Sequence, residues 1–292
     1  MTFNPDSDIS GGRASRRGRN TGIAVGGGLG AIALFLISQF LGVDLSGLVG
    51  GGEQAPAPTG SALEECQSGA DANERIDCRM VGASASLEDY WQEAAPTVGL
   101  EYTPPQDFVL FQDAVATGCG NASSATGPFY CPPDQTIYID TSFYDQLEQR
   151  FGAEGGPLAE MYVVAHEWGH HIQNIAGVLD STRDGQTGPA SNAVRVELQA
   201  DCFAGSWAAA ASSTEDPDGD PFLQPISREE YQQAIDAAAA VGDDRIQEAT
   251  QGQVTPHTFS HGTSEQRMRW FETGFEQGVG ACDTFEVSGD QL

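Results

Sequence analysis

Two histidines and a glutamate stand at the spacing that zinc hydrolases use for two metal ligands and a general base. The stretch is His166-Glu167-Trp168-Gly169-His170. Residues four apart lie on one face of a helix, so both imidazoles can reach one metal ion. Glu167 adjoins this face, where its carboxylate can take a proton from a metal-activated water. The preceding residues are mostly apolar, which favours a partly buried helix.

A later stretch supplies a candidate third ligand. Glu197 and Asp201 are four apart, share a helical face and have mostly apolar neighbours. A buried carboxylate needs a partner, and a catalytic zinc takes three protein ligands and a water. We therefore predict Glu197 as the third zinc ligand. We predict Asp201 as the acceptor that holds a ligating imidazole by its other ring nitrogen. The alternative is that Glu197 and Asp201 are a pair of solvated acids. Cys202 is not expected to be a ligand, because it is one residue further on and rotated away from this face.

Together the two motifs resemble the gluzincin layout, His-Glu-x-x-His followed by Glu-x-x-x-Asp on a later helix, of which thermolysin is the best-known member. More closely, the chain resembles the bacterial putative neutral zinc metallopeptidase family over roughly residues 63–285. Four blocks carry this resemblance in order: 118–140, 165–174, 197–205 and 259–267. It implies a zincin-like fold, a Zn²⁺ cofactor and a peptide or protein substrate.

The resemblance also implies roles for other parts of the chain. In such families an extended peptide lies along the edge strand before the zinc helix, and residues 136–140 are predicted to be that strand. In gluzincins a histidine outside the zinc helices often donates a hydrogen bond to the developing oxyanion, which gives His261 a catalytic role. The alternative is that His261 braces the start of the last helix. Arg267 is predicted to pair with a buried acid, and His171 to point away from the metal.

Periodicity and capping signals predict the elements that must position these residues. Helices are expected at about 87–95, 158–176 and 192–211, with two more starting at the capping boxes Ser227/Glu230 and Thr263/Gln266. Strands are expected at 108–111 and 136–140, separated by a loop over 118–133. Few strands followed by many helices predict an α+β fold. It should be mostly helical, with a small sheet whose edge strand flanks the active-site helix.

The N-terminal part differs in composition from the rest. Residues 1–21 are polar and rich in glycine, arginine and serine, and are predicted to be a disordered cytoplasmic arm. Residues 22–43 carry no charge and are predicted to cross the membrane once as a helix, with the preceding arginines inside. Residues 44–60 read as a linker, and 61–292 as an extracytoplasmic zinc metallopeptidase domain. A cleaved signal peptide and a secreted domain are the alternative.

Six cysteines all follow the apolar segment, which agrees with an exported domain. Spacing alone cannot select one pairing. The short intervals suggest Cys66–Cys78 and Cys119–Cys131, which leaves Cys202–Cys282 as a long-range pair. A zinc ribbon is the alternative, but no Cys-x-x-Cys pair occurs, so disulfides are favoured.

Charge and motifs together narrow the function. The chain has 13 basic residues, all arginine, against 42 acidic ones, and its net charge of −29 repels nucleic-acid backbones. The predicted function is zinc-dependent hydrolysis of peptide bonds by a membrane-anchored extracytoplasmic peptidase, with Glu167 as general base. The alternatives are a non-catalytic extracytoplasmic binding or assembly module with a structural zinc, and hydrolysis of a non-peptide amide. Glu167 favours an enzyme, because a structural zinc site is closed by four protein ligands.

Overall fold

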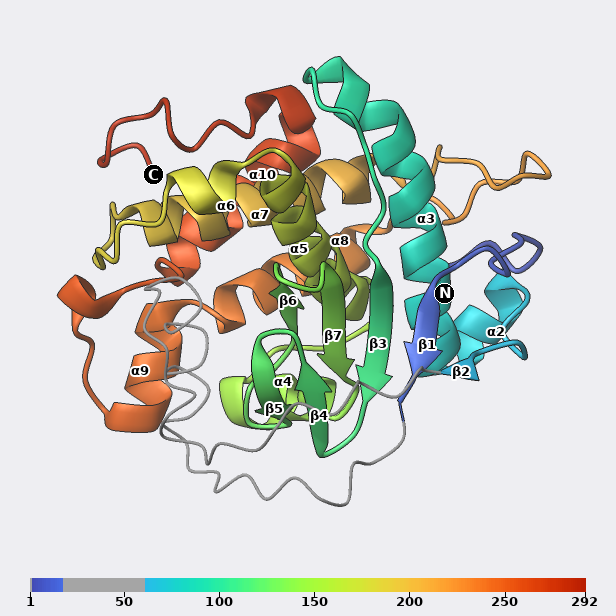
Figure 1. The fold of residues 1–292 in the computed structure, drawn as a ribbon, viewed down its shortest axis with the longest axis horizontal. Helices are drawn as coiled ribbons and strands as arrows, with labels where there is room; N and C mark the ends of the chain where they lie inside the picture. Colours follow the sequence, from blue (N-terminus) through green and yellow to red (C-terminus); the bar gives the residue numbers. More distant parts are fainter. Residues whose placement is uncertain (1, 18–60) are drawn as a thin grey trace.

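A five-stranded sheet and a larger layer of helices make up the fold, as expected for an α+β protein (Figure 1). The computed structural model describes residues 2–17 and 61–292. The strands are β1 (Ala14–Arg16), β2 (Ser61–Ala62), β3 (Asp107–Phe111), β4 (Ala114–Thr117), β5 (Gly120–Ser123), β6 (Phe129–Cys131) and β7 (Thr136–Asp140). The helices are α2 (Gly69–Glu74), α3 (Ile76–Thr97), α4 (Phe143–Phe151), α5 (Pro157–Ile175), α6 (Val178–Ser181), α7 (Asn192–Ala210), α8 (Arg228–Ala240), α9 (Asp243–Gln251) and α10 (Ser264–Gln277).

The sheet has the order β2-β1-β3-β7-β6, and this order corrects one prediction. Residues 136–140 form β7, which is not an edge strand: it pairs in parallel with β3 and antiparallel with β6. All five residues of β7 are buried, as is typical of a strand with neighbours on both sides. Among the described strands, the edge strand next to β7 is β6, which lies inside the stretch 118–133 that was predicted to be a loop. Its three residues are too short a run to be recognised as a strand in a stretch rich in glycine, serine and proline.

The same stretch also contains β5, which forms a two-stranded hairpin with β4. Val115, Ala122, Phe129 and Tyr138 pack together and give the hairpin a small apolar core of its own. The Cys119–Cys131 disulfide ties the end of the hairpin to β6. The edge strand is therefore fixed in place by a covalent bond and a cluster of buried side chains.

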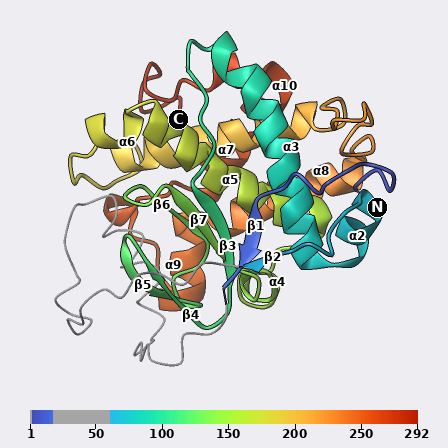
Figure 2. The same cartoon turned by 45° about the vertical axis from the view of Figure 1, so that its right-hand side comes forward.

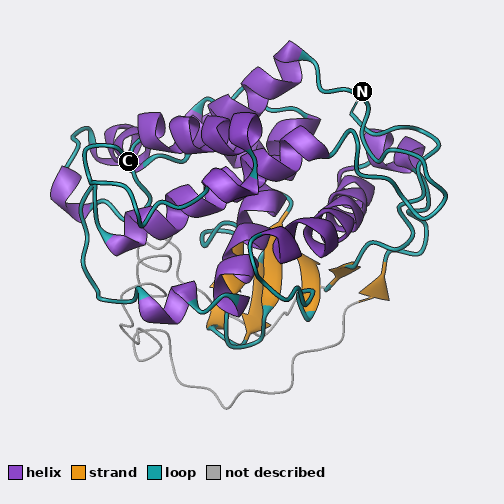
Figure 3. Cartoon of the chain, turned by 90° about the horizontal axis from the view of Figure 1, so that it is seen from above, coloured by secondary structure: helices purple, strands orange, loops and turns teal. Residues whose placement is uncertain are grey.

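Most helices lie on one side of the strands, as Figure 3 shows from above. The central helix is α5, which packs on α7 and α8 and touches β6 and β7 at the sheet (Figure 2). Helices α7 and α10 pack along each other, and the Cys202–Cys282 disulfide joins α7 to the segment after α10. The site helices are thus held by the main hydrophobic core.

The remaining predictions for helices and cysteines agree with the structure, apart from one helix. The helices at 158–176 and 192–211 are confirmed to within a residue as α5 and α7, and both capping boxes are present. All three suggested disulfides are formed, with Cys66–Cys78 joining the residues before α2 to α3. The helix predicted at 87–95 is much longer. It starts at Ile76 and includes Pro96 in its last turn, where few hydrogen bonds are lost.

The disordered arm predicted for residues 1–21 is wrong for residues 2–17, which belong to the fold. Phe3 and Ile9 are fully buried, and β1 is inserted between β2 and β3. Gly12 allows the close approach to α3, because a Cβ there would lie 2.2 Å from the carbonyl oxygen of Val81. Phe3, Ile9 and the short strand β1 hold this segment in the fold despite its polar composition. Residues 2–17 and 61–292 therefore belong to one folded unit.

The predicted membrane helix at 22–43 and linker at 44–60 lie outside the described residues. Within residues 2–17 and 61–292, no helix is both long and apolar enough to cross a bilayer.

Replacing Phe3 with alanine tests whether the N-terminal segment stabilises the domain. We expect Phe3→Ala to lower the free energy of unfolding by about 3 kcal/mol, because a buried aromatic side chain leaves a cavity. Urea unfolding monitored by tryptophan fluorescence measures this. The control is Val98→Ala, which shortens a side chain that is 46% exposed and should change the free energy very little. Equal stabilities for the two variants would show that residues 2–17 do not contribute.

Candidate metal centre

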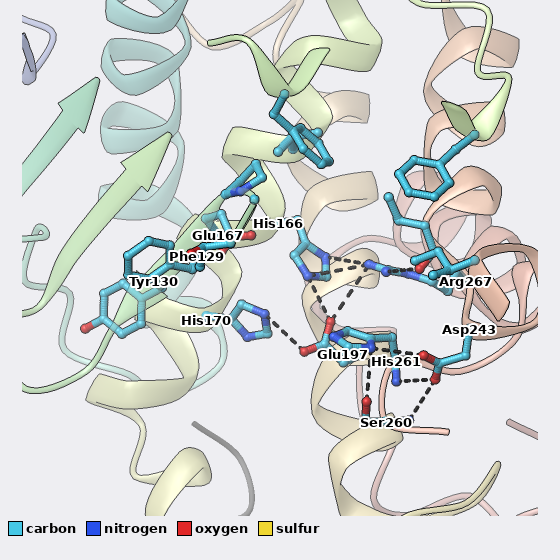
Figure 4. A pocket seen from close by; sticks show the side chains of 18 of the residues that line it. Phe129, Tyr130, His166, Glu167, His170, Glu197, Asp243, Ser260, His261 and Arg267 are labelled. Carbon is cyan, nitrogen blue, oxygen red and sulfur yellow. Dashed lines mark hydrogen bonds and ion pairs between the residues drawn. The ribbon is translucent and has the colours of Figure 1, made fainter. Parts of the chain in front are cut away.

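Helix α5 carries His166 and His170 on one face. Pro157 occupies the first turn, where its missing N–H costs nothing, and the helix continues into the core. The two imidazole rings lie with their centroids 4.7 Å apart, and both side chains are buried. Figure 4 shows them pointing toward the same carboxylate, that of Glu197. The expected pair of imidazoles is therefore in place.

Helix α7 brings Glu197 to this pair because α5 and α7 approach closely. The approach depends on Gly169, since a Cβ there would lie 3.0 Å from the Cα of Ala200. Oε2 of Glu197 lies 3.2 Å from Nε2 of His166, and Oε1 lies 3.5 Å from Nε2 of His170. Glu197 is itself almost fully buried. Two neighbouring helices thus place three candidate ligands around one point.

The donor set and its spacing fit a zinc ion. Two imidazole nitrogens and a carboxylate oxygen of His166, His170 and Glu197 lie within 4.8 Å of one another. Ligands about 2 Å from a tetrahedral zinc are roughly 3.3 Å apart, close to the separations that Glu197 makes here. His₂Glu is also a ligand set that catalytic zinc sites use. The group can therefore hold a metal ion without rearrangement of the helices.

Asp201 holds His166 from the other side, the arrangement expected from the sequence. Its Oδ1 lies 2.8 Å from Nδ1 of His166 and accepts a hydrogen bond from the Tyr162 hydroxyl at 2.5 Å. Arg267 donates from Nε to Oδ2 at 2.7 Å, so the predicted pairing of Arg267 with a buried acid is confirmed. The hydrogen bond between Nδ1 of His166 and Asp201 leaves Nε2 of His166 facing Glu197.

His170 has an equivalent support that the sequence analysis missed. Its Nδ1 donates to Oε1 of Gln173 at 2.8 Å, and the amide of Gln173 donates to the carbonyl of Val196 on α7. Gln173 lies three residues after His170, on the same helical face, and this spacing was the available signal. Both imidazoles are thus oriented by a partner at Nδ1.

The charges of the group shift its proton equilibria strongly. Burial opposes protonation of His166, but the carboxylates of Asp201 and Glu197 outweigh it and raise the pKa of His166 to about 9. Burial lowers the pKa of His170 to about 4. Burial would raise the pKa of Glu197, but the nearby imidazoles outweigh it and lower that pKa. Without a metal, one buried proton therefore lies on His166 beside two carboxylates.

Glu167 stands beside the three-residue group and is not part of it. The main-chain N–H of Tyr130 on the edge strand β6 favours the charged form of the Glu167 carboxylate. Burial raises the pKa of Glu167 to about 7. A carboxylate with a pKa near neutrality can both accept and return a proton at physiological pH.

His171 points away from the metal group, as predicted, and binds the edge strand. The hydroxyl of Tyr130 lies 3.0 Å from Nδ1 of His171 and accepts a hydrogen bond from Asn174 at 2.9 Å. On the other side of the ring, Nε2 of His171 donates to the carbonyl of Thr103 at 2.7 Å. Two residues of α5 therefore fix the side chain of Tyr130 on β6.

His261 lies near Glu197 and is held by Asp243, a residue that the sequence analysis missed. Nδ1 of His261 donates to Oδ1 of Asp243 at 3.1 Å. Oδ2 of Asp243 accepts main-chain N–H groups of Ser260, His261 and Gly262 (Figure 4). Burial opposes protonation, but Asp243 and then Glu197 outweigh it and raise the pKa of His261. Its Nε2 is buried with no hydrogen-bond partner among the described residues.

A cleft of about 460 Å³ opens over these groups. Its floor includes the metal group, Glu167 and His261, and β6 lies along one wall. Away from the metal group the lining becomes apolar, with Phe143 on α4, Val163 on α5 and Ile246 on α9. The cleft can therefore accept an extended chain with a bulky apolar side chain.

The family relation agrees with this geometry. The model of the family described as "putative neutral zinc metallopeptidase" matches residues 4–285. The chain belongs to this family. The protein Rv2575 of Mycobacterium tuberculosis strain H37Rv is 46% identical over 259 residues, which cover 86% of each chain. YpfJ of Escherichia coli K12 is 38% identical over 273 residues, which cover 90% of this chain and 88% of YpfJ. Both relatives are uncharacterized, and no solved structure matches.

Metal binding should release a proton, because a ligating imidazole must be neutral. His166 with a pKa of about 9 is protonated in the metal-free protein at neutral pH. The metal must displace that proton, so the affinity for zinc should rise about tenfold per pH unit between roughly pH 7 and 9. Calorimetry in buffers of different ionisation enthalpy measures the release.

The control for this experiment is Asp201→Asn, which removes the main influence that raises the pKa of His166. That variant should release less of a proton at pH 7.5. Zinc binding by the unaltered protein without any proton release would contradict the assignment of His166 as a ligand.

Proposed function

We propose that this protein is a zinc-dependent peptidase that hydrolyses peptide bonds in the cleft above α5. The observation that carries the proposal is the position of Glu167. A carboxylate that is not one of the three candidate ligands lies beside them and lines an open cleft. A structural zinc site has four protein ligands and does not use such a group. A non-catalytic assembly module would leave both Glu167 and the cleft without a role.

The residues of the chain would divide the reaction as follows. His166, His170 and Glu197 would hold the zinc, which supplies polarisation of the substrate carbonyl and a more acidic water. Asp201 and Gln173 keep the two imidazoles in their orientation and tautomer. Glu167 accepts the proton of the attacking water and passes it to the leaving amine.

The substrate would add to the sheet along β6. The free side of this edge strand borders the cleft, so an extended peptide can pair with its main chain. Tyr130 and Glu167 both line the cleft, so a peptide on this strand would lie beside the general base. His261 would donate from Nε2 to the developing oxyanion, since Asp243 orients the ring from Nδ1.

The disulfides favour a location outside the cytoplasm. All six cysteines form disulfides, which persist in oxidising environments. Attachment to a membrane through residues 22–43 stays a prediction. Hydrolysis of a non-peptide amide would use the same groups, and a substrate digest distinguishes it from peptide cleavage.

Replacing Glu167 with glutamine tests the central assignment. We expect Glu167→Gln to keep one zinc per chain and to lower kcat by about 10²- to 10⁴-fold, the usual contribution of a general base. Digestion of a peptide library, together with metal analysis of the same sample, measures both quantities. Glu197→Gln is the matched control, because the same change at a ligand should lower the zinc content. Full activity in Glu167→Gln would show that another group is the base.

His261→Gln tests whether His261 stabilises the oxyanion or only braces α10. We expect kcat to fall by about 10²- to 10³-fold, with KM and zinc content nearly unchanged, as when one oxyanion donor is removed. Asp243→Asn should give a smaller loss of kcat, because the ring is still present but less well oriented. If His261→Gln loses thermal stability but not kcat, the bracing role is correct.

A further inference from the structure

Two arginines of the cleft have no role in the proposed chemistry. Arg150 lies in the last turn of α4, and Arg183 follows α6. Both side chains line the cleft, and both residues are exposed. Neither makes an ion pair or a hydrogen bond with any residue in 2–17 or 61–292. Their guanidinium donors are therefore available to a ligand.

Most arginines in residues 2–17 and 61–292 are paired. Eight of these twelve arginines form an ion pair with a carboxylate. In the described parts of the chain, all arginines apart from Arg150, Arg183 and Arg228 bind a carboxylate or a main-chain carbonyl. These are Arg13, Arg16, Arg17, Arg75, Arg79, Arg195, Arg245, Arg267 and Arg269. Two of the three unpaired ones lie at the cleft.

The two cleft arginines come from different elements, one from α4 and one from the segment after α6. Helix α6 follows the C-terminal end of α5 (Figures 1 and 2). Helix α4 packs on α9, and its Tyr144 contacts the N-terminal half of α5 at Glu160. On α4, the cleft-lining residues Phe143, Gln146 and Arg150 follow one helical face. This face changes from a buried aromatic ring to an exposed cation. A peptide that fills the apolar part of the cleft therefore passes Arg150.

A structural explanation accounts for only one of these arginines. A cation in the last turn of a helix interacts favourably with the helix dipole, which would be sufficient reason for Arg150. Arg183 follows a helix of four residues, and no such benefit applies there. The feature that the two share is the cleft. Acidic residues elsewhere on the surface weaken the attraction of a peptide carboxylate to these arginines very little, because physiological salt screens exposed charges more than about 8 Å apart.

We propose that Arg150 and Arg183 bind carboxylates of the substrate, so that the cleft selects acidic peptides. The inference rests on the proposed peptidase function. Arginine binds a carboxylate through two parallel hydrogen bonds, a geometry that lysine cannot reproduce. The carboxylate can belong to an aspartate or glutamate side chain or to the C-terminus of the peptide. Binding of a C-terminal carboxylate would direct cleavage to chain ends, whereas binding of an acidic side chain would also allow cleavage within chains.

The first experiment measures cleavage by the zinc-loaded full-length protein. Peptides are compared in pairs that differ only by glutamate or glutamine at one position, or by a C-terminal acid or amide. We expect about a fivefold higher kcat/KM for the acidic member, the upper range for an exposed ion pair. Arg150→Glu and Arg183→Glu should each remove the preference at one position, and Arg150→Lys should restore part of it.

Arg228→Glu is the matched control, since Arg228 is exposed, unpaired in the described structure and outside the cleft. It makes the same change in net charge and should leave the preference intact. The inference is overturned if the acidic and neutral peptides are cleaved equally, or if Arg228→Glu has the same effect as the cleft variants. Cleavage without charge preference would leave the proposed function standing.

A binding measurement separates failure of the inference from failure of the proposed function. The same fluorescent peptides are titrated with zinc-loaded Glu167→Gln protein, with and without Arg150→Glu or Arg183→Glu, and followed by anisotropy. Tighter binding of acidic peptides that the arginine variants abolish supports the inference even if no peptide is cleaved. Equal binding of acidic and neutral peptides, or no binding of either, overturns it.

Discussion

The close approach of α5 and α7 is the constraint on which the site depends. At Gly169 the two helices are so near that even a methyl group would meet the backbone of Ala200. Glu197 and Asp201, one turn apart on α7, consequently contact opposite sides of the His166 ring. With wider helix spacing, neither carboxylate would reach the imidazoles. The glycine in the histidine motif therefore sets the spacing of the three candidate ligands.

Balance of buried charge is the second condition. Glu197 and Asp201 are both almost fully buried, and a buried charge is costly unless it is paired. In the metal-free structure Arg267 and the proton on His166 provide the compensation. A divalent ion would replace that proton and leave the Arg267–Asp201 pair unchanged. The site can thus exchange a proton for a metal without a change of fold.

The metal site was more predictable from sequence than the strands around it. Helical spacing is local, so it can be recognised in a single sequence, and it identified His166, His170, Glu197 and Asp201. The edge strand was misplaced because order in a sheet depends on partners far along the chain, and β7 gains its second neighbour only when residues 129–131 fold back. Asp243 was missed because its link to His261 joins the start of α9 to a loop after it. No periodicity reports such a contact.

Strand β1 has a consequence for how the protein matures. It occupies the middle of the β2-β1-β3 ladder, and Phe3 and Ile9 fill the core behind it. If the chain were cut after residue 17 and before residue 61, residues 2–17 would become a separate peptide, held only by noncovalent contacts. If that peptide dissociated, the paired edge of β3 would be exposed and open to association with other chains. An uncut chain thus keeps β1 next to β3 and leaves no free edge there.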